Sequence, residues 1–524
     1  MTEQPVVVVG AGPTGLTTAL LLARYGIACT VLDRRAEPWP LPRAVHLDDE
    51  AVRVLQAAGV SDAFAAVSRP AAGLRLLDAR LRPFARFRRD PGPAHHGHPA
   101  SNLFDQRDLD ALLLDAAARA GVVVRREVAV TGVATEASGS PTVAIRGPAA
   151  GTTARLPAAA VLGCDGADST VRQCIGAGLR DLGFTQRWLV LDVRCGEPPR
   201  GGWDGVDQVC DHRRAATFMR VVGDRYRWEF RLFPGEDAAE LTRPRSVTAL
   251  TAPWFAAVPG AHRDLLRGAD YTFRACVADR WRVDRVFLLG DAAHLTPPFV
   301  GQGLGAGLRD AHNLTWKLAA VLQGRADDQL LDSYQAERAP QAEATIRTAV
   351  RIGRAMTGGN GAAAALRRPI VAALLRLPGA ERRALAATTT RHPASSVVDR
   401  HRHPRDLAGT CCPQPFVWSA GATVRLDDVL GTGYSLLCHG PVPADLRDRA
   451  HAVGARTVRL GQPGARGLDD PDTTVEENPT LAGWLRRGRA DAVLLRPDRV
   501  VMSSSRGPGS RSRPTWRVSR TDLG

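Results

Sequence analysis

The chain has 524 residues, of which 44% are hydrophobic and 23% charged, a composition typical of a globular protein with two or three domains. Its formal net charge of +15 at pH 7 comes almost wholly from arginine, because Lys317 is the only lysine. These arginines are scattered along the sequence, so the charge indicates a bias in composition and gives little support for a nucleic-acid-binding protein.

The first predicted unit is a strand at 6–9, the turn Gly10-Ala11-Gly12-Pro13-Thr14-Gly15, a helix at 16–24 and a strand at 28–32. This is the G-x-G-x-x-G dinucleotide fingerprint in its strand–turn–helix setting. Gly10 makes the turn, Gly12 lets a pyrophosphate approach the backbone, and Gly15 lets helix and strand pack closely. Asp33, 18 residues after Gly15, is placed to bind a ribose diol.

The next segment contains Pro42-Arg43-Ala44-Val45-His46, followed by a helix at about 48–58 and strands at about 74–77 and 84–87. His95, His96 and His98 lie in a Pro- and Gly-rich loop without an acidic or cysteine partner nearby. We interpret them as part of a solvated loop and predict no metal site. Gln106 precedes an amphipathic helix predicted at 109–118.

Strands are expected at 122–124, 128–133 and 160–163. The last of these is followed by Asp165-Gly166 and a helix, which gives a second strand–turn–helix pattern. An aspartate there can hold a ribose or a bridging water. From 188 to 279 the alternation of polar and apolar residues predicts a mostly antiparallel sheet. Its polar residues are either an exposed face or the wall of a substrate site, and the sequence leaves both alternatives open.

A third pattern begins with an apolar run at 286–289, which predicts a buried parallel strand. It continues with Gly290-Asp291, with Pro297-Pro298-Phe299-Val300-Gly301-Gln302-Gly303-Leu304-Gly305, and with a helix from about 304 to 322. The start of that helix can face an anion, and Asp291 can accept hydrogen bonds from a polyol or a ribose. A long helix is expected at 330–352, helical sequence continues to about 390, and 392–414 reads as a polar linker.

The order of these three separated motifs resembles the single-component FAD-dependent aromatic hydroxylases, also called class A flavoprotein monooxygenases. The resemblance covers about residues 5–400. Pro42-Arg43-Ala44, Asp48-Asp49-Glu50-Ala51 and Arg282-Val283-Asp284-Arg285-Val286 are most similar to the 3-(3-hydroxyphenyl)propionate hydroxylases. The last section is similar to the thioredoxin-like domain of those enzymes, and because it lacks a C-x-x-C pair we expect it to be redox-inactive.

The resemblance implies an α/β fold with a Rossmann-like FAD-binding domain of the glutathione-reductase type. Its first part would span 1–185, with about 70–100 contributing to the substrate domain, and its second part, with long helices, would span 280–400. A mostly antiparallel substrate-binding sheet would be inserted at 186–279. The thioredoxin-like domain would occupy 410–524.

The resemblance also implies tightly bound, non-covalent FAD, with NAD(P)H as a transient co-substrate because there is only one dinucleotide fingerprint. The implied FAD contacts are Gly10, Gly12, Gly15, Asp33, Arg34, Arg43, Gln106, Asp165, Asp291, Pro298, Gly301, Gly303, Leu304 and Gly305. Many relatives have asparagine where this chain has Gly305, a departure that removes a side-chain donor and leaves the backbone donor intact.

The implied activity is hydroxylation of a phenolic or other aromatic substrate with NAD(P)H and O2, through a flavin C4a-hydroperoxide, in aromatic catabolism or natural-product tailoring. A phenol reacts best as phenolate, so a base or hydrogen-bond relay is needed. We choose His46 as the candidate base, because an imidazole with its ordinary pKa of about 6.5 suits the task. Arg220 and Tyr226 are further catalytic candidates on the substrate wall.

Two alternatives remain open from the sequence. One is a Baeyer–Villiger-type or other flavoprotein oxidoreductase on the same fold, acting on a polyketide-like substrate. The other is a binding protein that merely uses the fold. Nine dispersed cysteines, the lack of a secretory signal and the lack of a membrane-length apolar run favour a cytoplasmic protein without a membrane partner. The expected partners are a small aromatic substrate and O2, and the long helices allow a homodimer.

Overall fold

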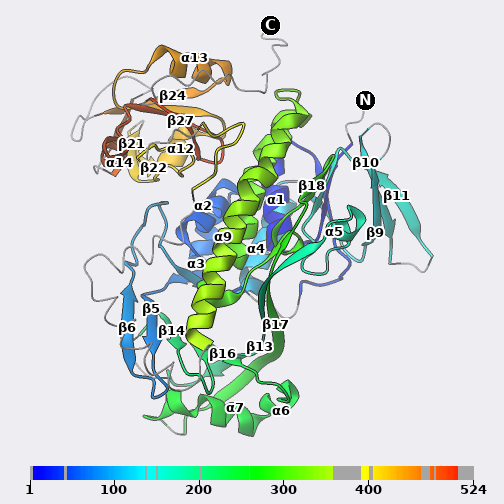
Figure 1. Ribbon diagram of the computed structural model, residues 1–524, viewed down its shortest axis with the longest axis vertical. Helices are drawn as coiled ribbons and strands as arrows, with labels where there is room; N and C mark the ends of the chain where they lie inside the picture. Colours follow the sequence, from blue (N-terminus) through cyan, green and yellow to red (C-terminus); the bar gives the residue numbers. More distant parts are fainter. Residues whose placement is uncertain are drawn as a thin grey trace.

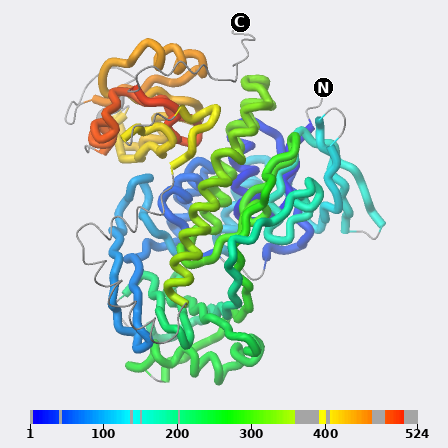
Figure 2. The backbone as a smooth tube through the Cα atoms, viewed as in Figure 1, coloured from blue at the N-terminus to red at the C-terminus, as the bar shows by residue number. Residues whose placement is uncertain are grey.

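The computed structural model of the protein describes residues 4–39, 44–135, 139–148, 151–199, 203–258, 260–357, 391–399, 405–419, 421–461, 473–476 and 480–505. Arg43 and the predicted helical stretch 358–390 lie outside these residues. The long helix α9 (Asp332–Thr357) crosses the middle of the molecule, with the C-terminal part near one end and a large sheet near the other (Figure 1). Residues 6–9 and 286–288 lie in the same region of the chain trace, in one sheet with the strand at 160–163 between them (Figure 2).

A mostly parallel sheet carries the three motifs, with strand order β18-β19-β12-β1-β2-β8, in which β18 pairs antiparallel with β19. Its strands are β18 (Arg282–Val283), β19 (Val286–Leu288), β12 (Ala160–Gly163), β1 (Val6–Val9), β2 (Cys29–Leu32) and β8 (Val123–Arg125). The predicted strand after residue 285 is confirmed as β19, which pairs in parallel with β12, and β12 pairs in parallel with β1. Because neighbouring parallel strands end at one edge, the turns that begin at Gly10, Cys164 and Leu289 leave the sheet side by side.

Helices pack around this sheet, and those with predicted bounds occupy nearly those bounds, whereas the helix at Ser61–Val67 was not predicted. They are α1 (Pro13–Arg24), α2 (Asp49–Ala57), α3 (Ser61–Val67), α4 (Gln106–Arg119), α5 (Thr170–Cys174) and α8 (Gly303–Leu322), with α9. Helix α8 packs against α1, and their apolar faces are buried in the same core. Apolar burial of this kind stabilises a helix far more than its intrinsic propensity does.

A second sheet, mostly antiparallel as predicted, has strand order β20-β17-β13-β16-β15-β14-β5-β6. Its strands are β20 (His294–Leu295), β17 (Arg263–Ala278), β13 (Leu179–Cys195), β16 (Arg225–Arg231), β15 (Ala216–Arg220), β14 (Val206–Val209), β5 (Gly73–Leu77) and β6 (Pro83–Arg88). Helices α6 (Ala238–Leu241) and α7 (Pro244–Thr251) lie at its lower end in Figure 1.

Two small sheets complete the central part of the chain. One is β11 (Thr153–Pro157), β10 (Pro141–Arg146) and β9 (Ala129–Thr135). The other is β3 (His46–Leu47), β7 (Asn102–Phe104) and β4 (Ser68–Pro70), in the order β3-β7-β4. The second one brings His46 next to the segment that precedes β7.

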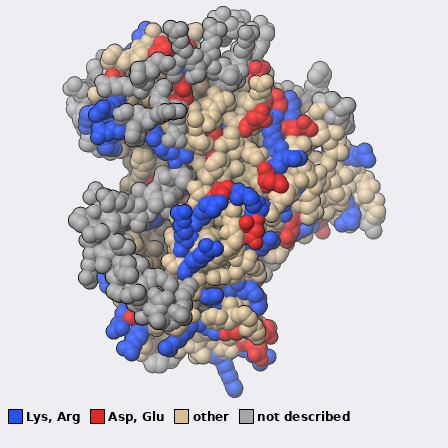
Figure 3. Space-filling view, in the orientation of Figure 1, with Lys and Arg blue, Asp and Glu red and all other residues tan. Residues whose placement is uncertain are grey.

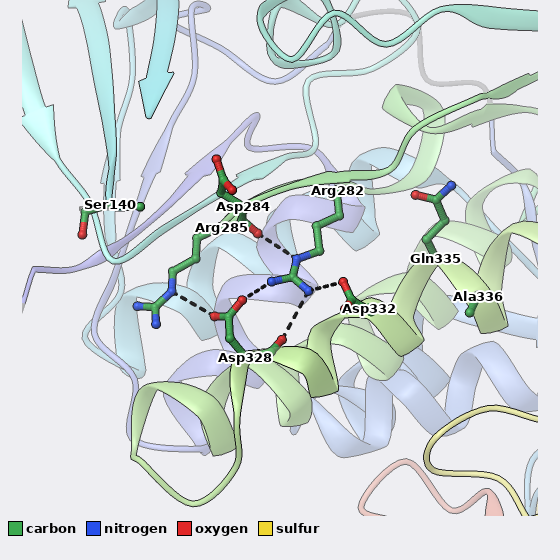
Figure 4. Close-up of a pocket in the computed structure, with 9 residues that line it drawn as sticks. Ser140, Arg282, Asp284, Arg285, Asp328, Asp332, Gln335 and Ala336 are labelled. Atoms are coloured by element: carbon green, nitrogen blue, oxygen red, sulfur yellow. Dashed lines mark hydrogen bonds and ion pairs between the residues drawn. The ribbon is translucent and has the colours of Figure 1, made fainter. Parts of the chain in front are cut away.

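An arginine-rich hairpin joins the parallel sheet to the start of α9 (Figure 4). Arg282 points between Asp328 and Asp332, with an Nη1–Oδ1 distance of 2.5 Å to Asp332, and Arg285 reaches Asp328 at 3.2 Å. These carboxylates are well exposed, so each pair adds little stability. These ion pairs tie the hairpin to the residues at and just before the start of α9.

The described residues of the C-terminal part form a further sheet of order β22-β21-β25-β24-β23-β26-β27 and three helices. Its elements are β21 (Phe416–Ser419), β22 (Ala422–Arg425), α12 (Leu426–Leu430), β23 (Ser435–Cys438), α13 (Ala444–Ala452), β24 (Arg456–Gly461), β25 (Thr473–Glu476), α14 (Thr480–Gly488), β26 (Ala492–Leu495) and β27 (Val501–Ser504).

Buried ion pairs dock this part against the first two-thirds of the chain. Arg53 of α2 donates from Nε and Nη2 to both carboxylate oxygens of Asp427, at 2.7 and 2.6 Å. Arg496 donates to Glu337 of α9 at 2.7 Å and also pairs with Asp498. Burial works to raise the pKa of Glu337, but Arg496 and Lys317 outweigh it and hold that pKa well below its ordinary range. The interface therefore depends on charges that water does not reach.

The prediction of a solvated loop at His95, His96 and His98 is wrong for His96 and His98, whereas His95 is exposed. The side chains of His96 and His98 are buried, because the C-terminal part covers them: Gln414 donates to the His96 carbonyl at 2.8 Å. Burial lowers the pKa of His98 to about 4, so its imidazole is neutral. In the described part of the chain no group of three His, Cys, Asp or Glu is arranged to hold a metal ion.

On the face shown in Figure 3, basic side chains extend from the C-terminal part to the large sheet, with acidic side chains among them. All nine cysteines lie within the described residues and are free thiols. No helix among those residues is both long enough and apolar enough to cross a membrane.

Replacing Arg496 by Met should lower the free energy of unfolding by about 3–5 kcal/mol, because it leaves the Glu337 and Asp498 carboxylates buried without their shared cation. Urea unfolding followed by tryptophan fluorescence would measure this. The exposed Arg456 on β24 offers the control, since Arg456→Met should change stability by no more than about 0.5 kcal/mol. Equal effects of the two substitutions would contradict a docking role for the buried pair.

Candidate active site

One cavity of about 900 Å³ is lined by all three motifs, by the β3–β7 segment and by one face of the second sheet. Most of the residues selected from the sequence line it: Gly10, Gly12, Asp33, Arg34, His46, Gln106, Asp165, Asp291, Pro298, Gly301, Gly303 and Leu304. Gly15 and Gly305 are buried in the first turns of α1 and α8 and do not line it. Arg43 lies outside the described residues. The motifs thus border a single space rather than separate ones.

The glycine-rich turn has the geometry that its spacing predicts. Gly10 has a φ of +105°, and a Cβ there would lie 2.4 Å from the Cys164 carbonyl oxygen. A Cβ on Gly15 would lie 2.0 Å from the Gly10 carbonyl oxygen, so only glycine lets α1 approach the turn this closely. A Cβ on Gly12 would meet nothing within 4 Å, which means that this backbone faces open space in the cavity.

Asp33 is fixed at the end of β2 by two backbone donors. The N–H groups of Ala11 and Arg35 each donate to one of its carboxylate oxygens at 2.8 Å. The side chain of Gln106 is also fixed by a backbone donor, because its Oε1 accepts from the Ala44 N–H at 3.0 Å. Both side chains also line the cavity.

Asp165 caps helix α5 as well as lining the cavity. Its Oδ1 accepts from the Ser169 hydroxyl at 2.5 Å, and its Oδ2 accepts from the Val171 N–H at 3.1 Å. Burial raises the pKa of Asp165 above its ordinary value, and these hydrogen bonds oppose the rise. Part of the carboxylate's capacity is therefore used by the chain itself.

A buried network that the sequence analysis missed holds the Gly290-Asp291 turn. The Gly290 N–H donates to Asp310 Oδ2 at 3.0 Å, and Arg338 Nε donates to Asp310 Oδ1 at 2.8 Å. His294 Nε2 lies 2.7 Å from Asp310 Oδ2. Burial works to raise the pKa of Asp310, but His294 and Arg338 outweigh it and hold that pKa below its ordinary range. The fixed carboxylate orients the turn that presents Asp291 to the cavity.

A second missed network fixes the start of α8. Arg309 Nη1 donates to Gln302 Oε1 at 3.0 Å, while its other nitrogens bond Glu50 at 2.7 Å and Asp48 at 2.5 Å. Burial works to raise the pKa of Glu50, but Arg309 lowers it to about 2. Gln302 is the residue before the first turn of α8, so this arginine ties α8 to the start of α2 at the cavity.

His46 bridges two segments at the cavity wall. Its Nδ1 lies 3.1 Å from the Gly301 carbonyl oxygen, and its Nε2 lies 2.8 Å from the Ser101 hydroxyl. Burial, with Arg89 nearby, lowers the pKa of His46, while the Gly301 bond and Asp48 oppose this shift. The imidazole is accordingly neutral at physiological pH.

The structure does not bring Arg220 and Tyr226 to the cavity. The two residues are paired across β15 and β16, and successive strand residues point to opposite faces. Tyr226 packs in the aromatic cluster with Phe218 and Trp228, while Arg220 bonds the Gly223 carbonyl and Asp204. The prediction chose the wrong face of a correctly predicted sheet.

The opposite face of the same strands forms the cavity wall. Thr217, Met219, Arg227 and Glu229 line it, together with Gln208 of β14. Arg227 Nε bonds Asp192 Oδ1 at 2.7 Å, and Arg267 contacts the other oxygen of the same carboxylate. Gln208 Nε2 donates to the Phe299 carbonyl at 3.1 Å, which fixes the sheet against the loop before α8. The chain neighbours of the predicted residues are the ones that line the cavity: Met219 beside Arg220, and Arg227 beside Tyr226.

These features fit an FAD molecule. Helices α1 and α8 both begin at the cavity without a side-chain cap and without an acidic residue in the first turn, so their N–H groups and dipoles favour an anion. The open space at Gly12 suits a pyrophosphate, and the carboxylates of Asp33 and Asp291 suit ribose and polyol hydroxyls. Apolar side chains of the sheet complete the enclosure.

Residues 3–349 match the model of a family described as FAD binding domain, and residues 409–511 match the HcaD C-terminal domain. The chain is 35% identical over 516 residues to a 3-(3-hydroxy-phenyl)propionate/3-hydroxycinnamic acid hydroxylase of Mycobacterium sp. (strain JLS), covering 95% of this chain and 89% of the relative. A hydroxylase of the same description from Burkholderia vietnamiensis (strain G4 / LMG 22486) is 33% identical over 533 residues, covering 96% and 94%.

Solved structures agree with this assignment. Aklavinone-11 hydroxylase, in complex with FAD and aklavinone, superimposes with a TM-score of 0.77 at 26% identity over 96% of both chains. The OxyS anhydrotetracycline hydroxylase from Streptomyces rimosus gives a TM-score of 0.73 at 27% identity, again over 96% of both chains. The chain therefore belongs to the FAD-dependent aromatic hydroxylases, the family of flavoprotein monooxygenases that its three motifs resemble.

Proposed function

We propose that this protein uses NAD(P)H and O2 to hydroxylate a phenolic substrate held between FAD and the second sheet. The observation that carries the proposal is the single cavity, which is bordered by two uncapped helix N-termini and walled by the sheet face with Met219 and Glu229. An enclosed site of this kind excludes water, which protects the oxidising species from unproductive decay.

The residues that would hold FAD are those that line the cavity from the three motifs. Gly12 and the start of α1 would bind the pyrophosphate, Asp33 the adenosine ribose, and Asp291 the ribityl chain. The N–H groups at Gly303 and Leu304 would face the anionic edge of the flavin, with Gln302 held in place by Arg309. When bound and reduced by NAD(P)H, FAD would activate O2. The chain would position FAD and the substrate and provide the charged and polar groups around them.

The substrate would lie against Thr217, Met219 and Gln208, with its hydroxyl group near His46 and Arg89, which both line the cavity. A neutral imidazole can accept the phenolic proton, and the Arg89 guanidinium favours the phenolate that remains. Arg227 is paired with Asp192, so we assign the contact with a substrate oxygen to Arg89, which lines the cavity.

The domain division expected from the sequence remains part of the proposal. The FAD-binding domain, at 1–185 and 280–400, would resemble the glutathione-reductase type, and 186–279 would be the substrate domain. A redox-inactive thioredoxin-like domain at 410–524 is supported by a mixed sheet with helices and by the lack of a C-x-x-C pair.

The direct test is substrate-stimulated NAD(P)H oxidation by the FAD-loaded protein, with 3-(3-hydroxyphenyl)propionate, 3-hydroxycinnamate, aklavinone and anhydrotetracycline as probes. Under ¹⁸O2 we expect one labelled oxygen atom in a product whose aromatic ring is intact. A ring-expanded product by NMR would instead indicate Baeyer–Villiger chemistry. If none of these probes, nor a wider panel of phenols, stimulates NAD(P)H oxidation, the proposed function is wrong.

Replacing Asp291 by Ala should abolish retention of FAD through purification, because an acceptor for the ribityl hydroxyls is lost from the cavity. The ratio of flavin to protein absorbance measures retention. Asp327→Ala, at an exposed position before α9, should leave the protein fully yellow. An Asp291→Ala protein that is equally yellow would count against the placement of the ribityl chain.

Two glycines of the first turn should respond differently to alanine. Gly12→Ala should fold normally, since its Cβ meets no protein atom, but should weaken FAD binding by roughly tenfold or more, about 1.4 kcal/mol. Gly15→Ala should destabilise the protein itself, because its Cβ would lie 2.0 Å from a backbone oxygen. Flavin titration and thermal unfolding of the apoprotein separate the two effects. Unchanged FAD affinity in Gly12→Ala would place the pyrophosphate elsewhere.

The two faces of β15 should also differ. Met219→Trp fills the cavity and should raise KM for the substrate by roughly tenfold, whereas Arg220→Ala should leave kcat and KM close to those of the parent. Steady-state kinetics with the best probe would measure both. A large loss of activity in Arg220→Ala would restore that residue as a candidate.

A further inference from the structure

We infer that Ser101 is the residue that contacts the reacting hydroxyl of the substrate, and that it passes the proton on to His46. This inference rests on the proposed function and assigns the proton path within it. Ser101 was not selected from the sequence, because a lone serine between a loop and a short strand carries no recognisable signal.

The hydrogen bonds of His46 determine its tautomer. The Gly301 carbonyl oxygen, 3.1 Å from Nδ1, can only accept, so Nδ1 carries the hydrogen. Nε2 is then the unprotonated nitrogen, and it accepts from the Ser101 hydroxyl at 2.8 Å. The lone pair of the imidazole is therefore already engaged. A substrate hydroxyl reaches it through Ser101, whose oxygen keeps lone pairs of its own.

The small sheet places both residues at the cavity. β3 begins at His46 and pairs antiparallel with β7, with His46 opposite Leu103, and Ser101 directly precedes β7. Ser101 and His46 are thus diagonal neighbours across the pair, within side-chain reach. Both line the cavity, and the side chain of Ser101 is largely buried, which holds its hydroxyl in one place.

Charges around the pair control the transfer. Arg89 and Arg309 oppose a positive imidazole and Asp48 favours it, while burial opposes it most strongly. An ordinary phenol has a pKa of about 10, well above that of an imidazole at about 6.5, so the transfer also needs a stabilised phenolate. Arg89 is positioned to stabilise it, because its Nη1 donates to the carbonyl of Ala100, the residue before Ser101, at 2.6 Å.

The proton balance is simple. The substrate O–H bond breaks as a new O–H bond forms on Ser101 Oγ, and the original Ser101 hydrogen moves to His46 Nε2. The products are a phenolate beside Arg89 and a His46 imidazolium that still donates to Gly301. After oxygenation the same path, run in reverse, returns this proton to the oxygen that gave it up; the proton that the ring carbon loses is separate from this relay.

The test compares Ser101→Ala and His46→Asn with the parent holoenzyme, using 3-(3-hydroxyphenyl)propionate or whichever panel phenol the parent hydroxylates. Asparagine can keep the donor to Gly301 but cannot take the Ser101 proton. At pH 7 both variants should form product about 100-fold more slowly, within the usual contribution of general acid–base catalysis. FAD affinity and the rate of flavin reduction should be unchanged for Ser101→Ala.

Dependence on pH separates a relay from a structural role. Both variants should recover progressively between pH 7 and 9, because the substrate then ionises increasingly without help, whereas the parent should change little. Ser101→Thr, which keeps the hydroxyl, should recover activity at pH 7. Ser68→Ala, on β4 of the same small sheet and away from the cavity, should match the parent at every pH.

Full activity of Ser101→Ala at pH 7, or a loss that does not diminish as the pH rises, would overturn the relay. Loss of FAD from Ser101→Ala would show a structural role instead. These outcomes differ from a failure of the proposed function, in which the parent enzyme itself hydroxylates no phenol.

Discussion

The close contact of α8 with α1 and with the Gly290 turn, made at Gly307, is the constraint on which the rest of the site depends. A Cβ on Gly307 would lie 2.5 Å from the Thr14 hydroxyl oxygen of α1 and 3.2 Å from the Gly290 Cα, so α8 can lie directly against both. This contact brings a helix from the third motif against a helix from the first. Both helix N-termini then open on the same cavity, and their dipoles act on one bound molecule.

Buried arginines maintain this arrangement. Arg309 ties the start of α8 to α2, Arg338 holds the carboxylate of Asp310 behind the Gly290 turn, and Arg53 and Arg496 dock the C-terminal part. The planar guanidinium offers several donors in a fixed geometry, which suits a buried cation that must bond two or three groups. The arginine bias of the composition therefore has structural consequences at these positions, whatever its origin.

The cavity wall shows why element prediction did not reach the substrate site. The alternation over 188–279 predicted a mostly antiparallel sheet, and β15 and β16 are two of its strands. The alternation of side chains along a strand does not indicate which face of the sheet lines a cavity, and here both faces carry polar and aromatic residues. Arg220 and Tyr226 lie on the face covered by the aromatic cluster, while Met219 and Arg227 face the cavity. The packing of the sheet in the folded chain decided which face lines the cavity.

By itself, the sequence determined the local units and the family. The Gly10–Gly15 turn, the strand before Gly290 and the helix from Gly303 follow from the spacing of glycines and from apolar runs, which are properties of neighbouring residues. Only the tertiary structure decided the contacts between distant segments. Asp310 behind Gly290, the burial of His96 and His98 beneath the C-terminal part, and Ser101 beside His46 all depend on residues that the fold brings together. Periodicity reports which side of an element is apolar; it does not report what lies against it.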